Sequence, residues 1–264
     1  MKIAICFNGQ IRDGVDCSKN ILEYIGDLKE NCDFFVHTWD IDTVSHNIGL
    51  PSERQPFTQY PVSQSTIHDF REVYNPKRIV IEEFNNTQIQ NIQGGLRFNK
   101  QLNKNVVAMF ESGYYVNSFK KDYERDNDFK YDYVVRMRPD LIFSSSKSLK
   151  DDLSQVDEKT FVYGAHAECY GPSRAEDVLW FATSENMDKI ANFYDFYGDS
   201  RSCWQIASAS YIRNECGLSV NCLNNNDFTV YYNQYKTHFK WNVLEDTMKC
   251  VLYFKDLCEK NKRR

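Results

Sequence analysis

Residues 131–143 read YDYVVRMRPDLIF and decide the fold that we predict for this chain. The apolar run at 133–135 is rich in β-branched side chains and is typical of a central strand covered on both faces. Pro139 has no backbone N–H to give to a sheet, so we expect it where this strand leaves the sheet. Asp140 is then placed at the carboxyl end of a strand, where open α/β sheets hold their ligands.

The polar centre of this stretch consists of Arg136, Arg138 and Asp140. Two guanidiniums and one carboxylate are costly to bury without partners, whereas a polyanion bridged by a divalent cation would satisfy all three. An Arg–Asp ion pair at a strand end, without any ligand, is the alternative interpretation. We favour a ligand site at this position.

Composition limits the classes of protein that remain. The 264 residues, 42% of them hydrophobic, are enough for one substantial core. A net charge of -5 gives no global basic field for nucleic acid, and no apolar run approaches the ~20 residues of a membrane span. The first residues lack the pattern of a secretory signal, and the 9 cysteines show no CxxC pair. These features predict a cytoplasmic protein without a membrane span and without a nucleic-acid partner.

The amino-terminal third has a strand–helix–strand pattern, with strands at 2–7 and 32–39. This βαβ order is typical of a parallel sheet. The first strand leads into Asn8, Gly9, Gln10 and Arg12, where a glycine lets a ligand approach the backbone and an arginine can reach a phosphate. Asp40 follows the second strand and forms a DxD sequence with Asp42, which could bind metal, meet a ribose or base, or cap a loop.

The rest of the chain continues the alternation of helices and strands. The predicted fold class is therefore α/β, with a Rossmann-like, mostly parallel sheet flanked by helices and a helical, aromatic carboxyl-terminal portion. The polar segment 43–65 is expected to be a loop, and 221–226 a turn. Further elements are expected as helices at 66–74, 102–123, 184–197, 202–216 and 244–257, and as strands at 78–84, 160–163, 178–183 and 228–232.

Several of these segments together resemble a known family. FNGQIR after the first strand, FFVHTWD in the second, a long helix entering YDYVVRMRPDLIF, and the later helix SENMDKI resemble small GT-A type glycosyltransferases of large DNA viruses and bacterial polysaccharide loci. The resemblance covers roughly residues 1–200. It implies one GT-A-like domain over 1–264, with residues 1–143 binding a nucleotide-diphosphate sugar and 144–264 facing a glycan acceptor.

The resemblance also implies a metal. In such enzymes a DxD motif at a strand end holds Mn²⁺ or Mg²⁺ against the diphosphate of the donor. Here Arg138 stands where the first aspartate would be, and Asp140 alone matches. Either Asp140 binds the metal together with His238 or His166, or Arg136 and Arg138 neutralise part of the diphosphate charge. We favour metal binding through Asp140 and His238.

The remaining site residues also follow from the resemblance. Asp177 is expected to act as the general base beside the acceptor, and capping of a strand is its alternative role. Arg138 is expected to stabilise the departing phosphate. The residues expected to bind the nucleotide sugar are Phe7, Asn8, Gly9, Gln10, Arg12, Asp40, Arg136 and Arg138.

Two other functions remain open. A sugar-phosphate nucleotidyltransferase would share the sheet and the metal, but ordinarily adds a glycine-rich basic loop after the first strand, where this chain has the single Gly9. A non-catalytic module that binds a glycan or a protein partner would retain the fold, and the incomplete DxD motif favours it. The sequence predicts a glycosyltransferase first.

Overall fold

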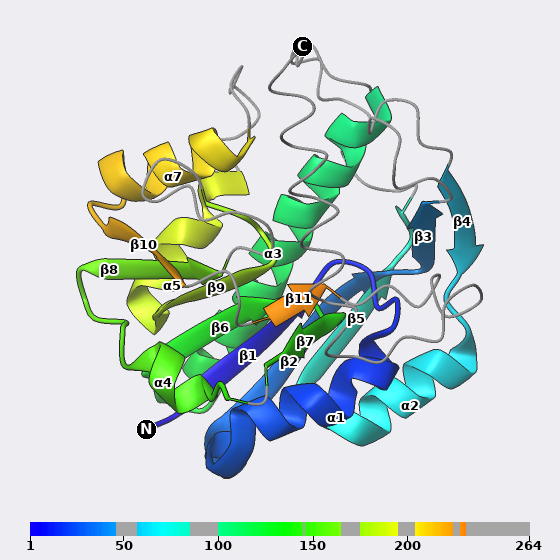
Figure 1. Ribbon diagram of the computed structural model, residues 1–264, viewed down its shortest axis with the longest axis horizontal. Coiled ribbons are helices and arrows are strands. Elements are labelled where there is room, and N and C mark those ends of the chain that lie inside the picture. Colours follow the sequence, from blue (N-terminus) through cyan, green and yellow to red (C-terminus); the bar gives the residue numbers. More distant parts are fainter. Residues whose placement is uncertain are drawn as a thin grey trace.

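The computed structural model describes residues 1–45, 57–84, 100–144, 146–164, 175–194, 204–223 and 228–230. Its centre is a seven-stranded sheet with the order β10-β8-β9-β6-β1-β2-β5 (Figure 1). The strands of this sheet are β1 (Ile3–Asn8), β2 (Cys32–Trp39), β5 (Arg78–Glu82), β6 (Tyr133–Met137), β8 (Thr160–Gly164), β9 (Leu179–Thr183) and β10 (Ser219–Leu223).

The sheet is mostly parallel. β1 pairs in parallel with both β2 and β6, and β2 with β5, while β8 and β10 also run parallel to each other. β9 lies antiparallel between β6 and β8. The structure therefore has the predicted α/β class, with a fold compatible with the Rossmann type.

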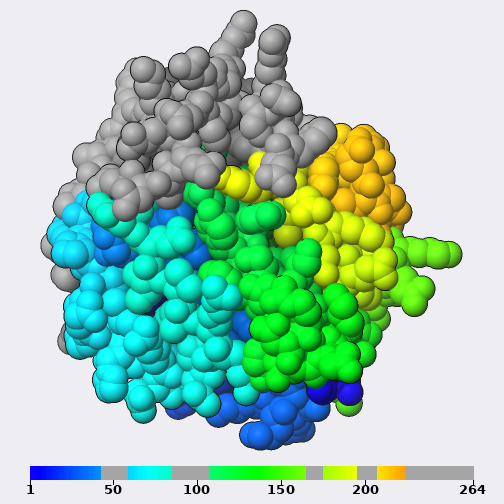
Figure 2. Space-filling model, turned by 180° about the vertical axis from the view of Figure 1, so that it is seen from behind, coloured from blue at the N-terminus to red at the C-terminus, as the bar shows by residue number. Residues whose placement is uncertain are grey.

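Helices cover both faces of the sheet (Figure 1). On one face lie α1 (Gly14–Ile25), the short η1 (Gly26–Asn31), α2 (Gln64–Tyr74) and α4 (Leu149–Leu153). On the other face lie α3 (Lys100–Asp126), α5 (Ser184–Ala191) and α7 (Trp204–Asn214). Seen from behind, the surfaces of α3 (green) and α5 (yellow) lie side by side (Figure 2).

Strand alternation explains how one sheet serves two cores. Along β1, Ile3, Ile5 and Phe7 belong to the core under α1 and α2, whereas Ala4 and Cys6 belong to the core under α3. All five side chains are almost fully buried. The strand is therefore apolar throughout, as expected for a central parallel strand covered on both faces.

Most of the expected elements are found where the sequence predicts them. The long helix extends over Lys100–Asp126, and the second strand has the predicted bounds, Cys32–Trp39. The expected cap of α5 is displaced by one residue, because the Thr183 side chain, not Ser184, accepts the hydrogen bond from the Asn186 N–H.

Three short pairings were not predicted. β3 (Ile41–Ser45) and β4 (Phe57–Pro61) form an antiparallel pair, and most of this pair lies in the segment 43–65 that we expected to be a loop. β10 includes 221–223, which we expected in a turn. β7 (Leu141–Phe143) pairs with β11 (Phe228–Val230) in a second small sheet. Each of these strands forms by pairing with another strand, and local periodicity does not indicate which segments will pair.

Some predicted elements fall outside the described residues, among them the last helix at 244–257 and much of the loop 43–65. Within the described ranges, none of the helices combines the length and the apolar character that crossing a bilayer requires.

Candidate ligand site at the carboxyl edge of the sheet

The candidate site lies where the direction of the chain through the sheet reverses. β1 is central, with β2 and β5 on one side and β6, β9, β8 and β10 on the other. The carboxyl ends of β1 and β6 therefore flank a topological switch point, the usual position of ligands in open α/β sheets. The segments that emerge there are 8–14 after β1 and 138–140 after β6.

Asp140 is the centre of a group of charges that we call the edge cluster, formed by Arg12, Asp42, Arg138 and Asp140. Arg138 binds Asp140 with two hydrogen bonds, from Nε to Oδ1 at 2.8 Å and from Nη2 to Oδ2 at 2.6 Å. The Arg12 Nη1 atom lies 3.4 Å from Oδ2 of the same carboxylate. The Asp140 side chain is 0% exposed, while those of Arg12 and Arg138 are 30% and 20% exposed.

The two guanidiniums keep Asp140 ionised although it is buried. Burial by itself would raise the pKa of this carboxyl group, but the charges of Arg138 and Arg12 and the hydrogen bond from Arg138 hold its pKa below 3.8. Within the edge cluster, Asp140 is thus a fixed, buried negative charge, and its two arginine partners are partly exposed positive charges.

Close packing brings the two segments together. A Cβ atom on Gly14, the first residue of α1, would lie 2.8 Å from the Pro139 Cβ atom, so only glycine allows α1 to approach this turn. Arg12 has a positive φ of 47°. Its backbone N–H donates to Asp42 Oδ1 at 2.9 Å, and its Nε donates to Gln10 Oε1 at 3.1 Å. These contacts fix the Arg12 side chain beside Asp140.

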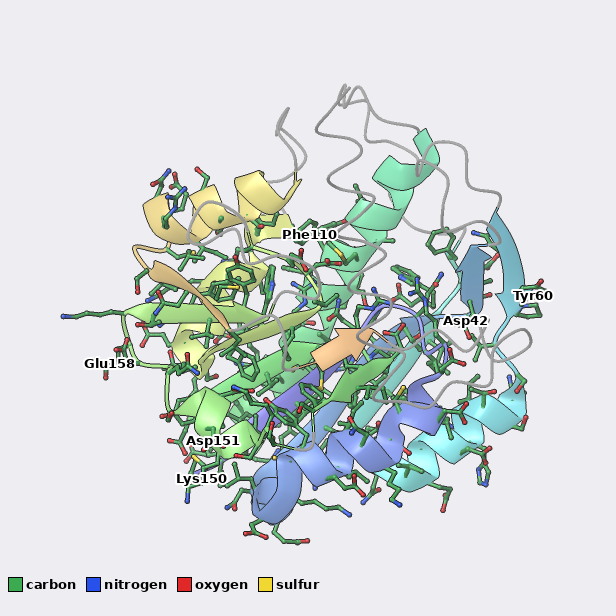
Figure 3. All side chains as sticks on the ribbon, viewed as in Figure 1. Asp42, Tyr60, Phe110, Lys150, Asp151 and Glu158 are labelled. Atoms are coloured by element: carbon green, nitrogen blue, oxygen red, sulfur yellow. The ribbon has the colours of Figure 1, made fainter. Side chains whose placement is uncertain are left out.

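Asp42 is the site residue that the sequence interpretation did not select. It lies near the start of β3, on the side of the molecule where β1 and β2 end (Figure 3). Burial raises its pKa, and the hydrogen bond from the Arg12 N–H opposes that shift. Strand alternation could not have selected it, because side chains two residues apart on a continuous strand point to the same face, and Asp40 and Asp42 are separated here by the break between β2 and β3.

Asp40, which was expected to contact the donor, has a structural role instead. Its Oδ1 accepts a hydrogen bond from the Phe84 N–H at 3.0 Å, and its backbone N–H donates to Glu82 O at 2.8 Å. These bonds tie the end of β2 to the end of β5. The loop-capping alternative therefore describes Asp40.

Phe7 is also part of the core and not of the site surface. Its ring is 1% exposed and packs against Phe34, Phe70 and Tyr74, with centroid distances of 6.0, 5.7 and 4.7 Å. The alternation of β1 turns this side chain toward α1 and α2, so Phe7 cannot reach a ligand at the strand end.

Arg136 and Asn8 form a buried support behind the site. Arg136 is 4% exposed, donates from Nε to Asn8 Oδ1 at 3.1 Å, and its guanidinium lies 4.3 Å from the centre of the Trp180 ring. Burial lowers the pKa of Arg136 to about 10. A Cβ on Gly113 of α3 would overlap the Arg136 guanidinium, so a larger residue there would require this side chain to move. Neither Arg136 nor Asn8 is exposed to a ligand, contrary to the expected donor contact.

The Gly9 backbone is held by α3. Its N–H donates to Ser112 Oγ at 2.8 Å, and Ser112 Oγ is in turn 2.9 Å from His37 Nδ1. His37 is fully buried, which lowers its pKa to about 4, so the ring is neutral at pH 7. The start of the loop after β1 is therefore rigidly attached to the sheet and to α3.

Asp177 arrives at the same edge because β9 is antiparallel. It precedes the start of β9, beside the end of β6, where the Arg138 N–H donates to Val178 O at 3.0 Å. The negative charge of Asp177 raises the pKa of the nearby Arg136 and so opposes the effect of burial. The structure thus brings Asp177, Arg138 and Asp140 to one edge of the sheet.

The described side chains do not fit a divalent cation at Asp140. Both of its oxygens already accept contacts from guanidiniums, and a cation there would face two positive charges at contact distance. No group of three metal-binding side chains occurs in the part of the chain that the structure describes. His238 and His166 lie outside it, so the expected ligand pair of Asp140 and His238 stays a prediction.

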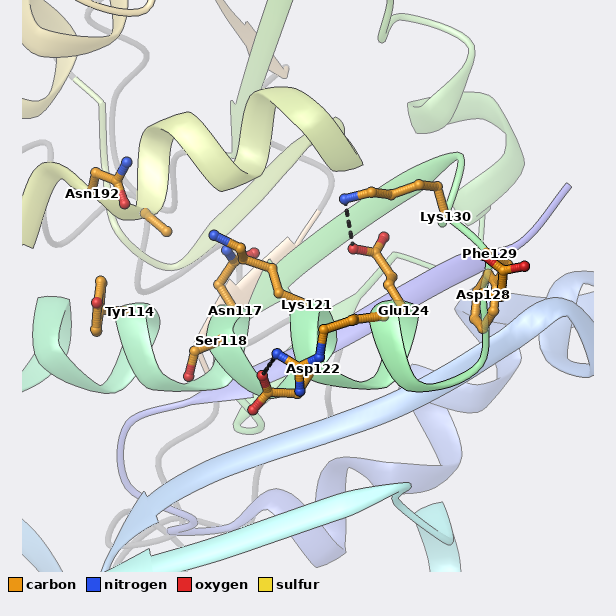
Figure 4. Close-up of a pocket in the computed structure, with 12 residues that line it drawn as sticks. Tyr114, Asn117, Ser118, Lys121, Asp122, Glu124, Asp128, Phe129, Lys130 and Asn192 are labelled. Carbon is orange, nitrogen blue, oxygen red and sulfur yellow. Dashed lines mark hydrogen bonds and ion pairs between the residues drawn. The ribbon is translucent and has the colours of Figure 1, made fainter.

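A second group of charges, the helix cluster, joins α3 to α5 around the buried Lys120 and Glu124. Its members are Lys120, Glu124, Lys130 and Asp188. The Lys120 Nζ atom, in a side chain that is 0% exposed, donates to Glu124, Ser184 and Asp188 at 3.1, 2.7 and 2.7 Å. Lys130 lies 3.2 Å from Glu124 (Figure 4). Hydrogen bonds from Ser184 and the Tyr131 N–H, and the charge of Lys120, lower the pKa of Glu124 against the effect of burial.

The helix cluster lies beneath an open groove of about 730 Å³ (Figure 4). Its lining includes basic and acidic side chains of α3 in similar number, together with the end of α5. The groove extends toward the start of β6, at the edge of the sheet opposite to Asp140. Its mixed charge does not favour one class of ligand.

Searches against protein-family models and against curated proteins found no match to this chain.

Proposed function

We propose that this protein is a glycosyltransferase of the GT-A type, which moves a sugar from a nucleoside-diphosphate donor to a glycan acceptor. The observation that carries the proposal is the convergence of Arg12 and Arg138 on Asp140 at the switch point of the parallel sheet. This position is where open α/β sheets hold nucleotide ligands.

The charges of the site suit a departing diphosphate. Sugar transfer from such a donor develops negative charge on the phosphate oxygens, and fixed cations stabilise that charge. Arg12 and Arg138 are partly exposed and provide planar N–H groups that match phosphate oxygens. The amino terminus of α1 begins two residues after Arg12 and adds a partial positive charge on the same side.

Asp177 supports the transfer step of the proposal. An inverting transfer needs a base that removes the proton of the acceptor hydroxyl group. Asp177 is half-buried and lies at the same edge as Arg138, beside the end of β6. We assign it this role, with residues after Phe143 providing the acceptor side.

The proposal is tested by incubating the protein with a panel of sugar nucleotides and glycan acceptors. We expect release of the nucleoside diphosphate, which depends on the acceptor. Asp177→Asn should abolish turnover while donor binding persists, and Asp126→Asn, at the exposed end of α3, should leave turnover unchanged. Release of pyrophosphate would indicate a nucleotidyltransferase, and absence of turnover across the panel would contradict the proposal.

A non-catalytic binding module is the second candidate. The observation that favours it is the presence of Arg138 where the family has a carboxylate, which leaves Asp140 as an ion-pair partner. Such a module should bind a glycan or a sugar nucleotide without any turnover, and Asp177→Asn should not affect that binding.

A further inference from the structure

We infer that Arg12 and Arg138 themselves hold the diphosphate of the donor, without a divalent cation, and that Asp140 is a positioning residue that orients the two guanidiniums. The inference rests on the proposed function and names the chemistry that the site recognises, a pyrophosphate group. It differs from the metal-bridged arrangement that a DxD motif implies.

Both carboxylate oxygens of Asp140 accept contacts from guanidiniums. Arg138 occupies both carboxylate oxygens in the bidentate geometry that is typical of a strong Arg–carboxylate pair, at 2.8 and 2.6 Å. Arg12 approaches Oδ2 from a second segment of chain, at 3.4 Å. The Asp140 carboxylate is 0% exposed, so it orients the two guanidiniums and is not accessible to a ligand.

The guanidiniums of Arg12 and Arg138 are partly exposed, whereas the carboxylate of Asp140 is not. Of the three ionic groups that meet at Asp140, the two guanidiniums reach the surface, with 30% and 20% of their side chains exposed. The fourth member of the edge cluster, Asp42, is also partly exposed, and its carboxylate accepts from the Arg12 backbone N–H. A guanidinium has five N–H donors in a rigid plane, and two such planes can contact neighbouring phosphate groups. The ligand class that fits is therefore an anion with adjacent phosphates.

The backbone of Arg12 adopts a left-handed conformation. Its φ of 47° is uncommon for a residue with a side chain, and such conformations are found at functional sites more often than elsewhere. The carboxylate of Asp42 stabilises it by accepting the backbone N–H at 2.9 Å. The Asp42 carboxylate therefore binds the main chain of Arg12, while the Gln10 side chain accepts a hydrogen bond from Arg12 Nε.

The test is calorimetric titration of the intact chain with inorganic pyrophosphate and with UDP, both in EDTA. Arg12→Gln should weaken binding about 10- to 100-fold, as expected for the loss of a charge-assisted hydrogen bond. Arg78→Gln is the matched control, because it also removes an arginine from an ion pair, with Asp122 at 3.3 Å, but at the opposite edge of the sheet. We expect it to leave the affinity within about 2-fold of the wild-type value.

Asp140 is tested by a conservative and a truncating substitution. Asp140→Asn keeps an oxygen that accepts from a guanidinium but is a poor ligand for Mn²⁺, so it should retain binding in EDTA. Asp140→Ala removes the acceptor and should weaken binding about 10-fold. Thermal unfolding of each variant shows whether it is folded. Loss of binding in a folded Asp140→Asn variant would overturn the positioning role.

The outcomes separate this inference from the proposed function. Pyrophosphate binding that depends on Arg12, without any sugar transfer, would support the inference and contradict the proposed function. Sugar transfer that requires Mn²⁺ and is unaffected by Arg12→Gln would do the reverse. Absence of binding of either probe, or binding only with Mn²⁺, would overturn the inference.

Discussion

The edge cluster and the helix cluster contain similar residues but differ in how their charges are satisfied. In the helix cluster, Lys120 is fully buried and donates to three oxygens. The cluster contains two basic and two acidic side chains, so their formal charges cancel. In the edge cluster, the carboxylate of Asp140 is buried but the guanidiniums of its partners are partly exposed. The first arrangement joins two helices around a buried cation, with Lys130 exposed beside it, whereas the second has a buried anion and both of its cations partly exposed.

Position in the fold accounts for this difference. The helix cluster lies between α3 and α5, where helix packing excludes water from Lys120. The edge cluster lies at the carboxyl ends of parallel strands, which an open sheet leaves uncovered by its own helices. We therefore expect the charges of the helix cluster to stabilise the fold and, under the proposed function, those of the edge cluster to bind a ligand.

Breaking the helix cluster should have the largest effect on stability. Lys120→Met removes the buried cation that contacts both Glu124 and Asp188, and leaves the buried Glu124 with the largely exposed Lys130. We expect the free energy of unfolding to fall by about 3–5 kcal/mol. Urea titration measures this change. Lys121→Met, at the exposed neighbouring position, is the control and should have little effect. A loss for Lys120→Met as small as that of the control would show that the cluster does not stabilise the fold.

Breaking the edge cluster should have a smaller effect that depends on pH. Arg138→Gln removes the bidentate partner of the buried Asp140, leaves the longer contact to Arg12 as its ion pair among the described residues, and should lower the free energy of unfolding by about 3 kcal/mol at pH 7. In the wild type the folded-state pKa of Asp140 is below 3.8, so its contribution is complete above that pH and is lost as the pH falls further.

The sign of the pH effect reverses in the variant. Without Arg138, burial raises the pKa of Asp140, and the deficit at pH 7 should shrink as the pH falls and the carboxyl group is protonated. Urea unfolding between pH 3 and pH 7 measures both curves, with Arg78→Gln as the control for loss of one arginine. A deficit that is the same at every pH would show that Asp140 is not held by Arg138.

The support behind the edge cluster should show the smallest of these effects. Gly113→Ala places a Cβ against the Arg136 guanidinium, and overpacking of this kind costs about 1–3 kcal/mol, partly offset by the better helix propensity of alanine. In an Arg136→Met background, the same substitution should cost much less. An equal cost in both backgrounds, measured by urea unfolding, would rule out the steric contact.

Much of the fold could be predicted from sequence, because it depends on local periodicity. Pro139 and the apolar run before it predicted the end of the central strand β6, and the apolar run at 3–7 predicted that β1 is a buried strand. The antiparallel direction of β9 and the β3–β4 pair could not be predicted, since they depend on which strand lies beside which. Such pairings are decided by tertiary packing.

The site was predicted less completely than the fold. Arg12, Arg138 and Asp140 were expected at one edge, and the structure brings them into contact there, because strand ends of a parallel sheet meet at that edge. Arg136 and Phe7 were placed wrongly, because the sequence does not show which face of a strand is covered by α3 or α1. Asp40 was selected where Asp42 contacts Arg12, because the sequence does not show that the chain turns from β2 into β3 between these two residues.

Hydrogen exchange with and without a nucleoside diphosphate tests the central claim most directly, since it compares the two clusters in one experiment. With UDP or GDP present, we predict slower exchange of amides in the segments 8–14 and 138–143, and no change in 117–130 or 184–192. Slower exchange confined to the α3 and α5 segments, or no change in either region with both nucleotides, would contradict the assignment of the edge cluster as the ligand site.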